Sequence, residues 1–234
     1  MSAPLFPPLL RGEAVRAGID PLGKAMAAGM LGADPGLVVW SEDPDALDAA
    51  VLLAPEMPLR QAAGAAFAVM LGFADALGAL APPEVAVHFD WPFGLRVNGA
   101  ACGRVRAAAG GADPDRAPDW LALALRAPLR LRGREPGEDP AVTALAEEGC
   151  AELTAPQLLE SWSRHFLVWL NRFVDDGMPP LHAAWRGRCE AIGGAVESPA
   201  RGLFLGLDED GGMILREGAA TRIIPLTDMM EPER

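Results

Sequence analysis

The 234-residue sequence predicts an α+β fold, in which helices pack against a mixed, mostly antiparallel sheet. Helix-like and strand-like stretches fall in separate blocks, as in proteins that segregate their helices from an antiparallel sheet. The Asn98-Gly99 pair lies between two runs of alternating apolar and polar residues, which is the strongest short-range signal of a β-hairpin. After Cys189, four short apolar runs follow one another with Gly-containing turns between them, and they predict a small separate β unit.

The N-terminal third predicts two helices and two strands. Residues 1–12 are rich in Pro and predict an extended arm. Residues 13–31 predict a helix that is interrupted at Asp20-Pro21, where Asp caps a helix and Pro occupies its first turn. Short apolar runs at 37–40 and 49–53 predict strands on either side of a polar turn. The longest helix of this part is predicted over residues 58–80, because apolar residues recur there at helical spacing.

The stretch 85–111 is the best local candidate for a functional site. It predicts two adjacent strands, with Trp91-Pro92 at the first bend and Asn98-Gly99 at the hairpin turn. Gly103 lies inside the second strand. A Gly at such a position marks a bulge or a place where a ligand or another backbone approaches closely.

The C-terminal half predicts one long strand, several helices and the small β unit. Two linkers, 110–119 and 132–140, flank the strand, and the helices are short at 141–148, amphipathic at 155–176, and short again around Leu181 and Trp185. The long strand is predicted over 120–131, and the last four strands over 192–197, 202–207, 213–216 and 221–226. Because so short a meander buries little apolar surface by itself, we expect an SH3-like barrel docked on the main domain.

Composition excludes several classes of function. The net charge of -12 argues against nucleic acid as a partner, since phosphates require a basic surface, and equally against anionic membranes. The three cysteines are widely spaced and form no CxxC motif, which is typical of a reduced, cytosolic protein. The N-terminus does not resemble a signal peptide, and no uninterrupted apolar run is long enough to span a bilayer. We therefore expect a soluble, cytoplasmic protein with no nucleic acid or membrane partner.

Motifs that carry chemistry by themselves are missing from the sequence. His88, His165 and His182 are far apart and lack metal-ligand spacing. There is no GxSxG elbow and no Gly-rich phosphate loop. Cys102 lies in a strand that should be half buried, where a cysteine usually serves as a small hydrophobe. The sequence alone thus assigns no catalytic residue and no metal site.

The hairpin sequence FDWPFGLRVNGAACGRVRA resembles the central motif of the biotin protein ligase and lipoate ligase superfamily. In that superfamily a Lys-Trp-Pro-Asn-Asp run is followed by a turn, a lysine, and a Gly three residues after it. Trp91-Pro92 and Gly103 match this motif in type and spacing, and the later strand, helices and C-terminal strands follow in the same order. The resemblance implies the fold shared by class II aminoacyl-tRNA synthetases and biotin ligases. It also implies a division into a ligase-like catalytic-type domain, residues 1–189, and an SH3-like barrel, residues 190–234.

Departures from the superfamily motif fall on its chemistry. Asp90 and Ala100 stand where the superfamily keeps lysines, and Phe93-Gly94 replaces the Asn-Asp pair. Residues 41–47 replace the Gly/Arg-rich loop that holds the acyl-adenylate. Making an adenylate requires fixed positive groups or a metal where negative charge develops on phosphate. The carboxylates expected around this place would repel ATP instead; they are Glu42, Asp43, Asp45 and Asp90.

The resemblance places a ligand pocket between residues 41–48 and the hairpin. The candidate substrate-binding residues are Trp40, Ser41, Asp90, Trp91, Pro92, Asn98, Gly99, Cys102, Gly103 and Arg104.

Three hypotheses for the function follow from this pocket. The favoured one is a ligase-like protein with a degenerate adenylation site, whose pocket binds a small molecule or a partner. The second is an active, divergent biotin or lipoate ligase that uses Arg104, Arg106 or Lys24 to stabilise charge, since Arg binds phosphate well. The third is a scaffold that recognises a biotinyl or lipoyl carrier protein without modifying it. Biotin, lipoate or ATP is expected as a ligand only if ligase activity is retained.

Overall fold

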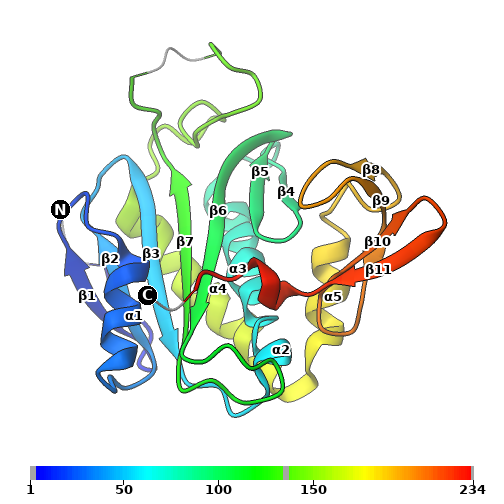
Figure 1. The fold of residues 1–234 in the computed structure, drawn as a ribbon. Helices are drawn as coiled ribbons and strands as arrows, with labels where there is room; N and C mark the ends of the chain where they lie inside the picture. The colour runs from blue at the N-terminus through cyan, green and yellow to red at the C-terminus, as the bar shows by residue number, and fades with distance from the viewer. Residues whose placement is uncertain (1–3, 134–136, 233–234) are drawn as a thin grey trace.

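The larger of two sheets has seven strands in the order β1-β2-β3-β7-β6-β5-β4 (Figure 1). The structure is a computed structural model that describes residues 4–133 and 137–232. Only the β1–β2 pair is parallel, and every other neighbouring pair is antiparallel, which confirms the predicted mostly antiparallel α+β fold. The strands are β1 Arg11–Val15, β2 Leu37–Ser41, β3 Ala46–Leu53, β4 Val87–Asp90, β5 Gly94–Val97, β6 Ala100–Ala109 and β7 Leu121–Pro128.

Helices cover both faces of this sheet (Figure 1). Helix α1 (Pro21–Met30) packs on one face, over a small core that includes Val39, Ala50 and Ala124. Helices α3 (Ala65–Leu80) and α4 (Ala155–Asp176) pack together on the other face, over the main core. Two shorter helices flank them, α2 (Leu59–Ala62) and α5 (Met178–Arg186).

The prediction of a helix over residues 13–31 is wrong in its first part. Residues Arg11–Val15 form β1, which pairs with β2 at the edge of the sheet, and the helix begins only at Pro21. Gly18 lies between them with a φ of 91°, a conformation that ends any regular element here. Asp20 does cap α1 as predicted, since its side chain accepts a hydrogen bond from the backbone N–H of Leu22. The predicted arm is described from residue 4 onward, and residues 1–3 lie outside the described part.

The predicted two-stranded hairpin is in fact three strands, β4, β5 and β6. The turn between β5 and β6 is the predicted one, with positive φ at Asn98 (49°) and Gly99 (89°). The register between β5 and β6 shifts by one residue beside Gly103, which confirms the predicted irregularity. Gly103 has a φ of 133°, and a Cβ there would collide with the carbonyl oxygen of Arg126 on β7. Gly is therefore required at this position by a close backbone approach.

Two helix predictions need correction. The helix predicted over 58–80 is divided at Gly64 into α2 and α3. The stretch 141–148 forms turns rather than a helix, because Val142 makes a β-bridge with Ala101 instead. Of the linker predicted over 132–140, residues 134–136 lie outside the described part.

One stretch, Leu59–Leu80, does reach the length and hydropathy of a membrane span, contrary to the expectation from the sequence. However, 78% of its apolar window is buried inside the protein, and α3 makes up most of the stretch. Twelve of the sixteen residues of α3 are buried between the sheet and α4. The stretch is therefore accounted for as a core helix of this fold.

The C-terminal residues form a four-stranded antiparallel sheet in the order β11-β10-β9-β8. Its strands are β8 Ala195–Val196, β9 Gly202–Leu207, β10 Met213–Glu217 and β11 Ala220–Ile224. The sheet is consistent with an SH3-like unit, but β8 and β11 are its two edges and no described residues close it into a barrel. It docks on the main domain, where Trp91 Nε1 donates a 2.9 Å hydrogen bond to the carbonyl oxygen of Gly211. Residues 233–234 of this unit lie outside the described part.

Candidate functional site

A row of charged side chains crosses one face of the sheet. Helix α1 packs on the same face, beside this row. Directly opposed residues share a face, and the register pairs Asp90 with Gly94, Gly94 with Arg104, Arg104 with Arg126, and Arg126 with Asp48. The row therefore runs over five strands, from β4 to β3. On its other side, the same sheet carries the apolar residues of the main core. This polar row is the natural place to look for a ligand site.

Arg106 lies two residues beyond Arg104 on the same face and is held by two carboxylates. Its Nε and Nη2 donate to Glu231 at 2.6 and 2.9 Å, and its Nη1 and Nη2 donate to Asp20 at 2.8 and 3.1 Å. The hydrogen bonds that Arg106 donates to Glu231 and Asp20 raise the pKa of its guanidinium. The hydrogen bond from Arg106 lowers the pKa of the Glu231 carboxyl in turn. Burial would raise the pKa of Asp20, but hydrogen bonds from Arg106 and Leu22 outweigh it and lower that pKa.

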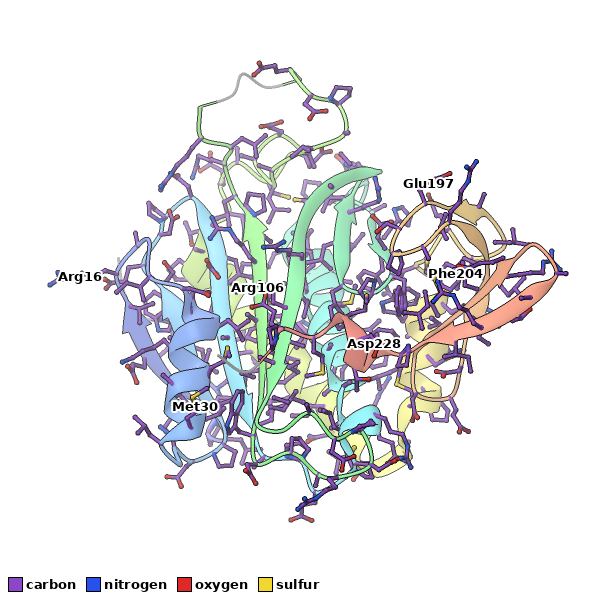
Figure 2. The ribbon with its side chains drawn as sticks, in the orientation of Figure 1. Arg16, Met30, Arg106, Glu197, Phe204 and Asp228 are labelled. Carbon is purple, nitrogen blue, oxygen red and sulfur yellow. The ribbon has the colours of Figure 1, made fainter. Side chains whose placement is uncertain are left out.

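Glu231 reaches Arg106 from the far end of the chain. After the turn Leu226–Met229, the C-terminal segment leaves the small sheet and crosses in front of β6 towards α1 (Figures 1 and 2). Its backbone is pinned where the Glu231 N–H donates a 2.7 Å hydrogen bond to the carbonyl oxygen of Ala107. A parallel β-bridge joins Glu231 to Ala108.

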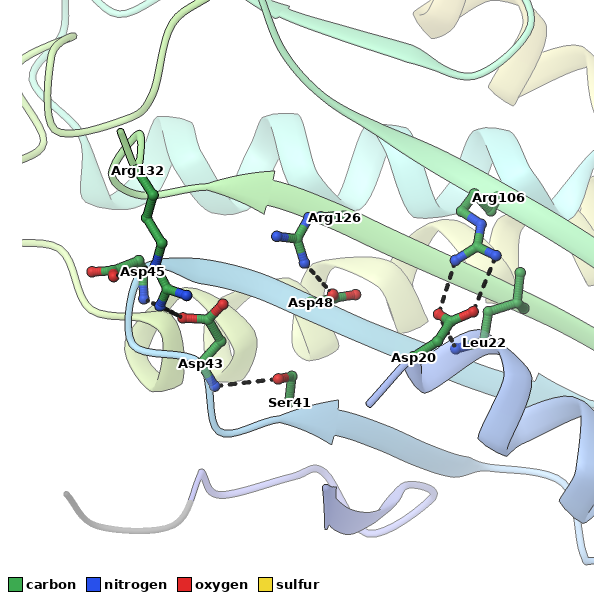
Figure 3. A network of polar contacts seen from close by, with 9 residues as sticks. All are labelled: Asp20, Leu22, Ser41, Asp43, Asp45, Asp48, Arg106, Arg126 and Arg132. Carbon is green, nitrogen blue, oxygen red and sulfur yellow. Dashed lines mark hydrogen bonds and ion pairs between the residues drawn. The ribbon is translucent and has the colours of Figure 1, made fainter. Parts of the chain in front are cut away.

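Two further arginines, Arg126 and Arg132, are also paired with carboxylates (Figure 3). Arg126 pairs with Asp48 across β7 and β3. Burial raises the pKa of the Asp48 carboxyl, and the charge of Arg126 opposes that rise without cancelling it. At the adjoining end of the sheet, Arg132 contacts Asp43 at 2.6 Å and Asp45 at 2.9 Å. An arginine of the same chain thus occupies two carboxylates of the acidic turn between β2 and β3, and it offsets part of their charge.

Arg104 differs from its neighbours. Its side chain is exposed, and among the described residues no hydrogen bond or ion pair joins that side chain to a partner. It stands directly opposite Arg126, a like charge, and such pairs are destabilising unless something compensates them. The charge of Glu231 offsets part of this repulsion, and Arg104 in turn helps to lower the pKa of the Glu231 carboxyl.

The structure brings together only some of the residues predicted to bind a substrate. Ser41, Asp90, Gly103 and Arg104 lie in or beside the polar row. Ser41 accepts a hydrogen bond from the backbone N–H of Asp43. Asp90 forms a 2.6 Å ion pair with Arg96.

The remaining predicted residues lie elsewhere. Trp40 and Cys102 contact the main core on the opposite face of the sheet, and burial raises the pKa of the Cys102 thiol to about 12. Trp91 packs against the C-terminal sheet, and Pro92 follows it in the turn to β5. The Asn98-Gly99 turn is tied to Glu148 through a 2.7 Å hydrogen bond from Asn98 Nδ2. Trp91 does share a cavity of about 350 Å³ with Asp90, beside Phe204 and Met213 of the C-terminal sheet.

Sequence reasoning missed three members of the site and gave another a different role. Arg126 had a visible signal, because it is a lone charge in an otherwise apolar strand. Arg132 and Glu231 had none, since both meet their partners only through contacts distant in sequence. Asp20 was predicted only as a helix cap, and it also binds Arg106.

Cavities open beside this face and elsewhere. One of about 300 Å³ lies next to Arg106 and is lined on its apolar side by Gly23, Met26, Ala27 and Met30 of α1. A larger one of about 720 Å³ lies between α5 and the β9–β10 turn. None of the residues of the polar row lines it. Among the described residues, no group of three or more His, Cys, Asp or Glu side chains is arranged to hold a metal ion.

Comparison with protein families gives two matches. A profile described as the biotin/lipoate A/B protein ligase family matches residues 6–187. A second profile, a domain of unknown function (DUF4444), matches residues 193–232. A biotin–[acetyl-CoA-carboxylase] ligase of Paracoccus denitrificans is 27% identical over 192 residues, which are 76% of this chain and 77% of that ligase.

Solved structures of similar shape bear related descriptions. A biotin protein ligase-like protein of unknown function from a Silicibacter species matches with a TM-score of 0.91 and 50% identity, over 98% of this chain and 100% of its own. The biotin protein ligase of Aquifex aeolicus matches with a TM-score of 0.72 and 15% identity, over 92% of this chain and 95% of its own. A structure of that ligase in complex with biotin and ATP gives a TM-score of 0.69 at 14% identity, over 91% and 95%. At such identities the Aquifex structures show a shared fold alone.

Proposed function

Because the chain belongs to the biotin/lipoate A/B protein ligase family, we propose that it keeps the ligand-binding face of that family but does not form an acyl-adenylate. In this proposal the polar row of the sheet binds a small molecule or a biotinyl or lipoyl carrier protein. The observation that carries the proposal is the state of the arginines. Arg106, Arg126 and Arg132 are each paired with carboxylates of the same chain.

Charge on this face does not fit the phosphates of ATP. Four arginines face five carboxylates, which are Arg104, Arg106, Arg126 and Arg132 against Asp20, Asp43, Asp45, Asp48 and Glu231. Phosphoryl and adenylyl transfer depend on fixed positive charge or on metal ions at the phosphates. Removing one such donor typically costs about 10²–10³ in rate. We therefore propose no reaction with ATP at this face.

Titration calorimetry tests the proposal. The protein is titrated with MgATP, biotin, lipoate and octanoate, each alone and then each acid in the presence of MgATP. We expect no saturable heat from MgATP and no strengthening of acid binding when MgATP is present. Saturable binding of MgATP would contradict the proposal.

An active ligase is the second candidate, and two observations favour it. The Paracoccus relative bears the name of a biotin–[acetyl-CoA-carboxylase] ligase. Arg104 remains exposed and is a competent phosphate ligand. If this candidate is correct, Arg104→Ala abolishes transfer of biotin or lipoate to a carrier domain, as followed by intact mass. Arg216→Ala, an exposed arginine of β10, is the matched control and leaves transfer unchanged.

We also propose the division of the chain into residues 1–189 and 190–234, and a cytoplasmic location. The two family profiles meet between residues 187 and 193, and β8–β11 form a sheet of their own, which supports this boundary. The three cysteines are all free and buried, which is consistent with a reducing compartment. Limited proteolysis that cuts preferentially between residues 187 and 195 would support the boundary, and cutting elsewhere first would count against it.

A further inference from the structure

We propose that the C-terminal segment around Glu231 is a latch that occupies an oxyanion-binding subsite centred on Arg106. The inference rests on the proposed ligand-binding function, because it assigns a ligand chemistry and a means of regulation to the same face. In the latched state the Glu231 carboxylate fills the subsite. When the segment lifts, the carboxylate or phosphate of another molecule takes its place.

The hydrogen bonds between Arg106 and Glu231 have the geometry of a guanidinium that binds an anion. Two parallel N–H groups of one guanidinium edge, Nε and Nη2, meet the two oxygens of Glu231 at 2.6 and 2.9 Å. This bidentate arrangement is the one by which arginine recognises carboxylates and phosphates in general. Glu231 thus serves as a ligand supplied by the chain itself.

The residue that orients Arg106 in the subsite, Asp20, does not belong to the latch. Asp20 holds the adjoining Nη1–Nη2 edge of the Arg106 guanidinium, and Asp20 itself accepts a hydrogen bond from the backbone N–H of Leu22 at the start of α1. Arg106 therefore keeps its orientation when Glu231 leaves. The freed Nε–Nη2 edge then points to the space that the carboxylate occupied.

The local charge rises from zero to +1 when the latch opens. With the segment in place, Arg104 and Arg106 are balanced by Asp20 and Glu231. Once Glu231 is removed, two arginines face one carboxylate, and the local charge becomes +1. Arg104 and Arg106 lie two residues apart on one face of β6, about 7 Å along the strand, so both act on the same incoming anion.

The segment is anchored at Met230, which packs against the main core, so that only Glu231 and Pro232 have to lift. Apart from the Arg106 ion pair, Glu231 contacts the described part of the sheet through one hydrogen bond to Ala107 and one β-bridge to Ala108. The side chains of Arg106 and Glu231 are 27% and 40% exposed, and ion pairs so open to water contribute little to stability. Opening is therefore within reach of a ligand that offers a better anion.

Room for the rest of a ligand is already present. The cavity of about 300 Å³ beside Arg106 has Glu231 and Pro232 as one wall, so lifting the segment enlarges it. Its other wall is the apolar side of α1, with Met26, Ala27 and Met30. A carboxylate carried on an apolar body would use this wall, whereas free phosphate would use only the guanidinium.

A matched set of variants tests the latch. Glu231→Gln keeps the shape of the side chain and removes its charge, and Glu217→Gln removes the charge of an exposed pair with Arg222 in the small sheet. Each variant and the wild type are titrated with octanoate and, separately, with inorganic phosphate. We expect Glu231→Gln to bind at least one probe about tenfold more tightly than the wild type, since a charge-assisted contact no longer competes. Glu217→Gln should match the wild type.

Arginine variants show whether the probe binds at Arg106. In the Glu231→Gln background, Arg106→Gln should remove the gain in affinity, and Arg106→Lys, which keeps the charge but loses the fork, should keep only part of it. Preference for octanoate over phosphate identifies a ligand with an apolar body, and equal affinity identifies the oxyanion alone. If Glu231→Gln binds both probes no better than the wild type, the proposal is overturned. Binding that survives both Arg106 substitutions overturns it as well.

Hydrogen exchange gives a readout that does not depend on any variant. The Glu231 amide donates to the Ala107 carbonyl, so it exchanges slowly while the latch is closed. A saturating concentration of the bound probe should speed exchange of this amide in the wild type. Unchanged exchange under saturation contradicts the latch. Neither result depends on ATP, so failure of the latch and failure of the proposed function are distinguishable.

Discussion

Gly103 is the residue on which the geometry of the polar row depends most. It combines a φ of 133° with a contact to the Arg126 carbonyl that leaves no room for a Cβ. Arg104 follows directly after it, so the bulge at Gly103 sets the face to which Arg104 points.

Replacing Gly103 with Ala should therefore destabilise the protein by about 3 kcal/mol, from backbone strain together with the collision at β7. Urea unfolding measures the change. Gly218→Ala is the control, since Gly218 also has a positive φ, 61°, but no atom lies within 4 Å of a Cβ placed there. It should cost about 1 kcal/mol, from the left-handed conformation alone. Equal costs for the two substitutions would contradict the proposed close approach.

Cys102 should behave as an inert core residue. Burial raises the pKa of its thiol from 9.0 to about 12. At pH 8 only about one thiol in ten thousand is then ionised, and the thiolate is the reactive form. Brief alkylation of the native protein followed by peptide mapping should leave Cys102 unlabelled until the protein is unfolded. Labelling at the rate of a free thiol would show that this face of β6 opens readily.

At the level of the elements, the contact between the C-terminal segment and β6 depends on pH through the Glu231 carboxyl. The pKa of Glu231 lies below its ordinary value of 4.5, chiefly because of the hydrogen bond from Arg106. A carboxyl with a lowered pKa stabilises the folded state fully above the pKa of the unfolded chain. That stabilisation is lost as the pH falls through the pKa of the folded state.

The stability of Glu231→Gln should consequently approach that of the wild type in acid. Above pH 6 the wild type should be more stable by about 1 kcal/mol, a modest value because the pair is partly exposed. Below pH 4.5 the difference should shrink towards zero as Glu231 is protonated. Urea unfolding at a series of pH values checks this, and a difference that persists unchanged at pH 3 would exclude Glu231 as the titrating partner.

How far each element could be predicted follows from the range of the interactions that form it. The helix Ala155–Asp176 was predicted with its observed bounds, because its apolar stripe, capping Thr154 and final Gly177 are all local signals. The strand β1 was missed because it depends on pairing with β2, twenty-six residues further along, and four of its five residues are exposed. The stretch 141–148 has local helical propensity, but Val142 pairs with Ala101 instead.

The site was less predictable than the fold for the same reason. The motif around Trp91-Pro92 and Gly103 lies beside the polar row that we propose as the ligand site. The ion pairs of Arg106 with Glu231, and of Arg132 with Asp43, join residues 125 and 89 positions apart. Only the assembled sheet brings such partners together.

At the scale of the whole molecule, Trp91 joins the two sheets. Its Nε1 donates to the carbonyl oxygen of Gly211, and Gly211 packs so closely that a Cβ there would contact Met178 and Leu226. Trp91→Phe keeps the apolar contact and leaves a buried carbonyl unpaired, which typically costs about 1–3 kcal/mol. We expect both sheets to unfold in one thermal transition whose midpoint is lower than in the wild type. Circular dichroism measures this transition. A variant as stable as the wild type would show that this hydrogen bond does not hold the C-terminal sheet.

We propose that carboxylates of the same chain already occupy Arg106, Arg126 and Arg132, so that no acyl-adenylate forms on this face. ATP–pyrophosphate exchange tests it most directly. The wild-type protein is assayed with biotin, lipoate and octanoate in turn, beside an active biotin protein ligase as positive control. We expect no exchange above the background rate that is measured when no acid is added. Exchange that depends on any one of the three acids would contradict it.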